Sequence, residues 1–85
     1  MNSIEKKSDE FLQKLYKESG GNPSNAKGMY DIGRKLGFDQ SLTKKIVQHL
    51  KDEGSIERVG FGTPDSGTLV SITLKGIKKV EETLQ

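Results

Sequence analysis

Two apolar stripes with helical spacing, each closed by a glycine, constrain the fold of this chain more than any other feature. Apolar residues three or four positions apart lie on one face of a helix, and glycine commonly follows the last helical residue. The first stripe ends at Gly37 and the second at Gly54. The stripe residues are Met29, Ile32 and Leu36, then Leu42, Ile46, Val47 and Leu50. The pattern predicts two short helices joined by a tight turn.

Capping residues and further stripes set the expected bounds of four helices. Side-chain oxygens of Asn, Asp, Ser and Thr begin helices by accepting from free backbone N–H groups. The expected helices, each with its cap, cover residues 3–18 (Asn2, in a capping box with Glu5), 24–36 (Asn22), 40–53 (Asp39) and 74–84 (Thr73). The last helix has an apolar stripe of its own, formed by Leu74, Ile77, Val80 and Leu84.

Gly33 stands inside the expected second helix, where glycine costs about 1 kcal/mol relative to alanine. We therefore expect the third helix to approach so closely at Gly33 that a larger side chain would be blocked. Phe38 follows in the turn, and we expect it to fill the core between the two helices.

A hairpin is predicted over residues 56–73. Its arms, 56–61 and 68–73, are rich in β-branched residues, and the segment between them contains Pro64 and Gly67 at turn positions. The tip has no Lys or Arg and carries Asp65. The Gly-Gly loop after the first helix leaves little room for another strand, so we expect the hairpin to be the whole sheet.

Composition indicates one small domain without catalytic or metal-binding chemistry. Eighty-five residues suit a single thin-cored domain. There is no cysteine, the single histidine has no suitable partners, and no stretch is apolar enough to span a bilayer. We expect a cytoplasmic protein that is not an enzyme and has no cofactor. The net charge is only +2, so any binding of nucleic acid must depend on local clustering of cations.

These elements together resemble the winged helix-turn-helix domains of prokaryotic, MarR-like and related transcription regulators. The resemblance is carried by three segments, which are residues 31–37 (DIGRKLG), 42–56 with Leu42, Ile46, Leu50, Gly54 and Ile56, and 72–76 (ITLKG). It covers nearly the whole chain. It implies an α+β, mainly α fold over residues 1–85, with a three-helix core, a β-hairpin wing and a C-terminal helix. It also implies that the helix over residues 40–53 reads the major groove of DNA.

One face of that helix has the residues that DNA recognition uses. At 100° per residue, Thr43 falls within the core arc and should be half-buried. The opposite face presents Gln40, Ser41, Lys44, Lys45 and Gln48, and no acidic residue occurs between Gln40 and Lys51. Gln can bond adenine, and Lys can reach guanine or phosphate. The alternative is an ordinary solvated, lysine-rich face.

Two further cations, Arg58 and Lys27, are candidates for contact with DNA, and His49 lies on the same helix as the predicted face. Arg58, near the base of the wing, either reaches DNA or pairs with Glu57 or another nearby carboxylate. Lys27, with the N–H groups near the expected start of the second helix, is a candidate phosphate site. His49 is expected to be a half-buried structural residue.

Two functions remain open at this stage. The first is a small transcription regulator that binds double-stranded DNA, acting as a homodimer through the C-terminal helix because one recognition helix buries little surface. The same helix could instead pack on the first helix of its own chain. The second function is a winged-helix adaptor that binds another protein, which the uncharged wing tip favours. Neither involves a small-molecule ligand.

Overall fold

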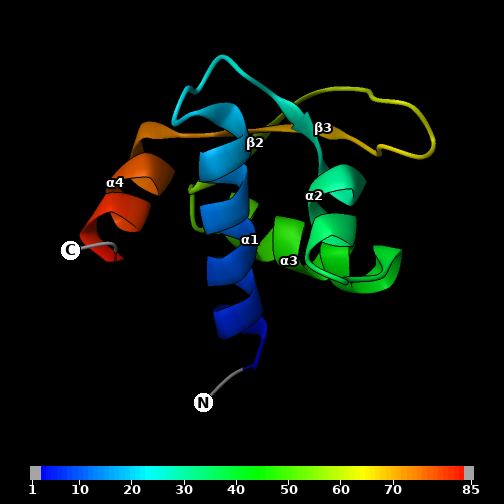
Figure 1. The fold of residues 1–85 in the computed structure, drawn as a ribbon, viewed down its shortest axis with the longest axis horizontal. Coiled ribbons are helices and arrows are strands. Elements are labelled where there is room, and N and C mark those ends of the chain that lie inside the picture. Colours follow the sequence, from blue (N-terminus) through cyan, green and yellow to red (C-terminus); the bar gives the residue numbers. More distant parts are fainter. Residues whose placement is uncertain (1–2, 84–85) are drawn as a thin grey trace.

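The computed structural model describes residues 3–83 and places four helices beside a three-stranded antiparallel sheet (Figure 1). In chain order, the elements are α1 (Ser3–Ser19), β1 (Lys27–Gly28), α2 (Met29–Lys35), α3 (Gln40–Asp52), β2 (Ile56–Gly60), β3 (Leu69–Ile72) and α4 (Leu74–Thr83). The predicted winged-helix architecture, mainly helical with a hairpin, is confirmed. Two expectations, the cap at Asn2 and the stripe residue Leu84, lie outside the described residues.

Helix α1 is the centre of the fold. It contacts α2, α3 and α4 and runs beneath the sheet, so that α4 and α2 lie on either side of it (Figure 1). Its stripe of Phe11, Leu12 and Leu15 is fully buried, together with Ile46, Val47 and Leu50 of α3. Each such side chain contributes roughly 1.5–3 kcal/mol by leaving water. Phe38 is partly buried against this core, as expected.

The second helix begins later than predicted. It starts at Met29 rather than residue 24, and its N-cap is Gly28, which has no side-chain cap bond. Asn22 forms a local turn instead, because its side-chain oxygen accepts from the N–H of Ser24 at 2.9 Å. The residues that were expected to form the first turn of the helix are used to bring the chain to the sheet.

The sheet has a third strand, so the expectation that the hairpin was the whole sheet is wrong. β1 pairs with β3 through Lys27↔Val70 and Gly28↔Leu69, giving the order β1-β3-β2. Gly20 and Gly21 both have positive φ, 66° and 69°. They turn the chain so tightly after α1 that a two-residue strand fits against the free edge of β3.

Close backbone approach explains Gly33, as predicted. A β-carbon added at Gly33 would overlap the Thr43 hydroxyl oxygen and lie 3.2 Å from the Thr43 methyl carbon. Asp39 caps α3 as expected, with its carboxylate accepting from the N–H of Leu42 at 2.8 Å. The turn between α2 and α3 is therefore fixed by the Asp39 cap, the close approach at Gly33 and backbone bonds such as that from the N–H of Phe38 to the Gly33 carbonyl at 2.9 Å.

Helix α4 packs on α1 of its own chain. Thr73 caps it by accepting from the N–H of Gly76 at 3.1 Å, and Val80 is buried. Leu74 was expected on the same buried side, but 78% of it is exposed. In this first turn of α4 the residue that faces inward is Gly76, where an added β-carbon would overlap the Ser55 carbonyl oxygen. Leu74 precedes Gly76 by about 200° around the helix, so it points outward.

A cluster of charges joins the end of α3 to α4 and α1. The Lys79 ammonium lies 2.8 Å from a carboxylate oxygen of Glu53 and 3.7 Å from one of Asp9. Burial alone would raise the pKa of the Glu53 carboxyl, but hydrogen bonds from Lys79 and Ser55 outweigh burial and hold that pKa below its ordinary value. The pKa of Lys79 is raised, chiefly by the same bond to Glu53.

Glu53→Gln should remove a pH-dependent part of the stability. A carboxyl whose pKa is lowered on folding stabilises the fold fully above its unfolded pKa, here near 4.5, and loses this contribution as pH falls through the folded value. We expect the variant to lose about 1 kcal/mol at pH 7, since the pair is partly exposed, with the difference shrinking below pH 4.5. Urea unfolding at several pH values measures this. Glu57→Gln, on an exposed residue of β2, is the matched control. A deficit that persists unchanged at low pH would contradict the assignment.

Candidate nucleic-acid interface

The outward face of α3 is the one predicted from its sequence. Ile46, Val47 and Leu50 are fully buried, whereas the five residues of the opposite face, Gln40, Ser41, Lys44, Lys45 and Gln48, are all exposed. Thr43 was expected to be half-buried, but only 1% of it is exposed. Its hydroxyl donates to the Asp39 carbonyl at 2.8 Å. Thr43 is fully buried because α2 approaches α3 at Gly33, which a single-helix projection does not include.

The lysines of this face have no competing carboxylate. Within residues 3–83, neither the Lys44 nor the Lys45 side chain forms an ion pair or hydrogen bond. Asp39 and Asp52 flank the helix, but Asp39 accepts from the N–H of Leu42 and Asp52 accepts from the Gln48 amide at 2.7 Å. Both ammonium groups are therefore available to an anionic partner.

Arg58 joins this face from the sheet. Its Nη2 donates to the Gln48 side-chain oxygen at 3.1 Å, and no ion pair to Glu57 is formed. Of the two sequence-based alternatives, pairing with a carboxylate is not formed by Arg58 among the described residues, and contact with DNA stays a prediction. The bond to Gln48 holds Arg58 beside the α3 face, across the gap between α3 and β2.

A trough separates α3 from the hairpin. One part has a volume of about 590 Å³ and is lined by Met29, Lys44, Gln48, Arg58, Gly60, Phe61 and Thr68. A second part, of about 380 Å³, shares four of these residues and extends to the hairpin tip at Thr63 and Pro64. No Asp or Glu lines either part. The trough thus brings Arg58, identified separately in the sequence, together with Lys44 and Gln48 of the predicted α3 face.

Phe61 is the site residue that sequence reasoning missed. It was assigned to the first arm of the hairpin, but β2 ends at Gly60, and 98% of Phe61 is exposed. The available signal was its position between Gly60 and Gly62. An aromatic residue flanked by glycines at the end of a strand has no neighbouring side chains to cover it.

The hairpin tip is fastened to α2. The Tyr30 N–H donates to the Ser66 carbonyl at 2.8 Å, and Arg34 Nη1 donates to the Asp65 carbonyl at 2.7 Å. The ring of Tyr30 also fills the space beside Gly67, where an added β-carbon would lie 2.6 Å from it. The hairpin tip is thus docked through its backbone, and Gly67 leaves the space that the Tyr30 ring occupies.

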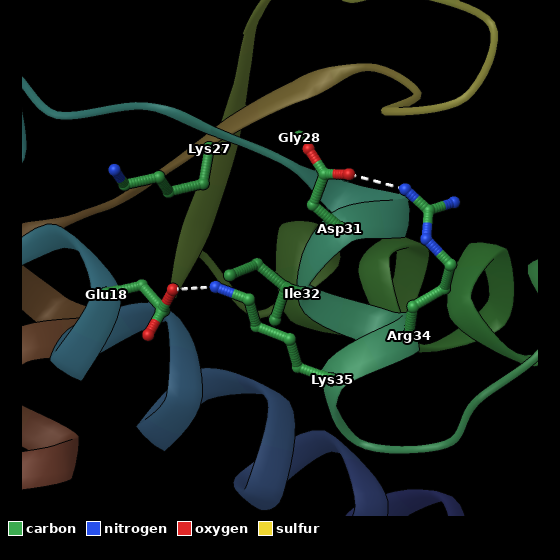
Figure 2. A pocket seen from close by; sticks show the side chains of 7 residues that line it. All are labelled: Glu18, Lys27, Gly28, Asp31, Ile32, Arg34 and Lys35. Atoms are coloured by element: carbon green, nitrogen blue, oxygen red, sulfur yellow. Dashed lines mark hydrogen bonds and ion pairs between the residues drawn. The ribbon is translucent and has the colours of Figure 1, made fainter.

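Lys27 lies in a different hollow, between α1 and α2, of about 500 Å³ (Figure 2). Here Lys35 pairs with Glu18, and Arg34 with Asp31. The hydrogen bond from Lys35 holds the pKa of the Glu18 carboxyl below its ordinary value, against a smaller opposing effect of burial. The predicted phosphate site rested on a helix that starts near residue 24, whereas α2 begins at Met29 and residues 24 and 25 precede β1, so their N–H groups are not at a helix start.

Other chemistry is sparse in the described part of the chain. His49 is partly exposed and lies 3.7 Å from a Glu53 carboxylate oxygen, consistent with the structural role expected for it. Residues 3–83 contain no group of three or more metal-ligating side chains. No helix among them has the length and apolar character required to cross a membrane.

The three-helix core, the three-stranded sheet and the docked hairpin define a winged helix-turn-helix domain. Solved structures that share this fold include the following two. The crystal structure of a MepR point mutant from a multidrug-resistant S. aureus clinical isolate superposes with a TM-score of 0.71 at 19% identity, over 91% of this chain and 53% of that chain. A probable transcriptional regulator from Pseudomonas aeruginosa gives a TM-score of 0.64 at 25% identity, over 87% of this chain and 54% of that one.

These likenesses confirm the predicted MarR-like winged-helix fold. The chain spans about half the length of each of the two matched chains. No family model and no curated protein matches its sequence.

Proposed function

We propose that this chain is the DNA-binding module of a small transcription regulator, with α3 reading the major groove of double-stranded DNA. The observation that carries the proposal is the exposed face of α3, where Lys44 and Lys45 have no carboxylate partner among the described residues, together with the adjoining trough, which no Asp or Glu lines. Its proposed contacts are Gln40, Ser41, Lys44, Lys45, Gln48 and Arg58. Both structural neighbours come from bacteria, and the P. aeruginosa protein is described as a probable transcriptional regulator.

The proposed roles follow from side-chain chemistry. Lys44, Lys45 and Arg58 neutralise phosphates or reach guanine, and Ser41, near the start of α3, donates to phosphate. Gln48 is shared between Arg58 and Asp52 in the free chain, so it must exchange these bonds for bonds to a base. The proposal leaves Lys27 out, because Lys27 lines the hollow between α1 and α2, which shares no residue with the trough.

Salt dependence tests this function directly. Binding that releases counterions from Z phosphates weakens with a slope of about −0.9Z in a plot of log K against log salt concentration. For three phosphate contacts we expect a slope of about −3. The measurement is fluorescence anisotropy of a labelled duplex, first selected from a random pool by this chain, between 50 and 300 mM KCl. A protein adaptor without DNA contact would give no binding at any salt concentration, which would favour the alternative function.

A homodimer remains part of the proposal, since a single recognition helix buries little surface. The buried side of α4 is occupied, however, because Val80 and Ile77 pack into the core of their own chain. A dimer would therefore use the outward side of α4, where Leu74 is exposed, or another surface. Sedimentation with and without the selected duplex distinguishes monomer from dimer. Action on chromosomal DNA would place the protein in the cytoplasm.

A further inference from the structure

We infer that Phe61 is an apolar DNA contact of the wing, pressing against carbon atoms of the duplex beside the phosphates held by Lys44 and Arg58. This inference rests on the proposed function and deepens it. The wing would then contact DNA through the base of the hairpin and an aromatic ring, rather than through a cation at its tip.

The first support is how Phe61 is presented. A single exposed apolar residue is ordinary on protein surfaces, but Phe61 is 98% exposed in a chain of which only 31% is hydrophobic. At Gly62, the next residue, an added β-carbon would overlap the Gly67 carbonyl oxygen, so the two sides of the hairpin approach closely through their backbones beside Phe61.

The second support is the rigidity of the platform. The bonds from the N–H groups of Met29 and Tyr30 to the carbonyls of Thr68 and Ser66, at 2.9 and 2.8 Å, tie the opposite arm to α2. Helix α2 is in turn fixed against α3 at Gly33. The backbone that carries Phe61 is therefore tied to the same core as the α3 face, and a preorganised backbone lowers the conformational entropy that is lost on binding.

The third support is charge. Phe61 lines both parts of the trough, and the charged residues that line them are Lys44 and Arg58. An aromatic ring that lines the same trough as two cations, with no carboxylate in the lining, suits a polyanion that also offers apolar carbon. DNA offers such carbon in two places, the thymine methyl group in the major groove and the faces of the deoxyribose rings.

The test compares Phe61→Ala with the wild-type chain on the selected duplex. We expect roughly tenfold weaker binding from the lost apolar contact, with the slope of log K against log salt unchanged, because no phosphate contact is removed. Phe61→Leu, which keeps an apolar side chain, should recover most of the affinity. Thermal unfolding should be the same for all three proteins, since the ring is exposed.

Two duplexes distinguish the carbon atoms that are contacted. In one duplex every thymine is replaced by uracil, which lacks the methyl group. If the ring contacts thymine methyls, wild type loses affinity for the uracil duplex and Phe61→Ala does not. If it contacts deoxyribose, both proteins bind the two duplexes alike and the tenfold difference between the proteins persists.

Other outcomes overturn the inference. If Phe61→Ala binds the selected duplex as tightly as wild type does, Phe61 does not touch DNA. Contact with a protein partner would then be the remaining explanation for the exposed ring. That result would leave the proposed function intact. Failure of the wild-type chain to bind any duplex would instead remove the proposed function and this inference together.

Discussion

Replacing Lys44 and Lys45 together by glutamate should weaken binding to the selected duplex by roughly 100-fold or more at 100 mM salt. Each phosphate contact contributes nearly one power of ten under these conditions, and charge reversal adds repulsion. The slope of log K against log salt should also become shallower by about 2. Both ammonium groups are exposed and unpaired among the described residues, so the substitution breaks no contact within the fold.

A matched variant separates local recognition from net charge. Lys6→Glu with Lys78→Glu makes the same change in charge on α1 and α4, at two residues outside the trough. We expect it to weaken binding by less than about tenfold, through long-range repulsion alone. Equal losses in the two double variants would contradict the assignment of the α3 face, even if DNA binding itself were established.

Gly33→Ala should lower the free energy of unfolding by about 2 kcal/mol. Alanine is the better helix former by about 1 kcal/mol, yet its methyl group would overlap the Thr43 hydroxyl where α2 and α3 meet. Overpacking of this kind typically costs about 1–3 kcal/mol. With the overlap at the helix contact placed at the upper end, about 3 kcal/mol, the gain in helix propensity leaves a net loss of about 2 kcal/mol. For a chain this short, the melting temperature should fall by roughly 10 °C. Thermal and urea unfolding followed by circular dichroism measure both quantities.

A double-mutant cycle shows whether the contact with Thr43 is the cause. In Gly33→Ala with Thr43→Ala, the overlapping hydroxyl is gone, so the combined loss should be smaller than the sum of the two single losses. Gly60→Ala is the control, because an added β-carbon there has only Leu69 within 4 Å, at 3.9 Å. Additive losses in the cycle would show that the two helices are not held apart by this side chain.

The local parts of the fold could be predicted because each depends on neighbours in the sequence. The caps at Asp39 and Thr73 and the glycine ends of α2 and α3 use bonds within a few residues. The exposed face of α3 follows from helical periodicity, so its five polar residues were placed correctly. Gly33 was interpretable because a glycine inside a helix is costly unless something requires it.

The errors arose where distant segments decide the outcome. Residues 24–28 have helix-compatible composition, but β3, some forty residues later, offers an open edge that Lys27 and Gly28 pair with. Leu74 belongs to a helical stripe, but the close approach of α4 to Ser55 leaves room only for Gly76 on the inward side. No local pattern contains the partner in either case.

The sequence by itself determined the helix pair, the hairpin and which side of α3 faces solvent, because periodicity and capping are encoded locally. Only the tertiary structure decided which residues from other elements adjoin the exposed face of α3. The docking of the hairpin on α2 through Tyr30 and Arg34 brings Arg58 and Phe61 to the edge of α3 and leaves Lys27 in another hollow. Such groupings depend on how separate elements pack, since residues distant in the sequence become neighbours only when the chain has folded.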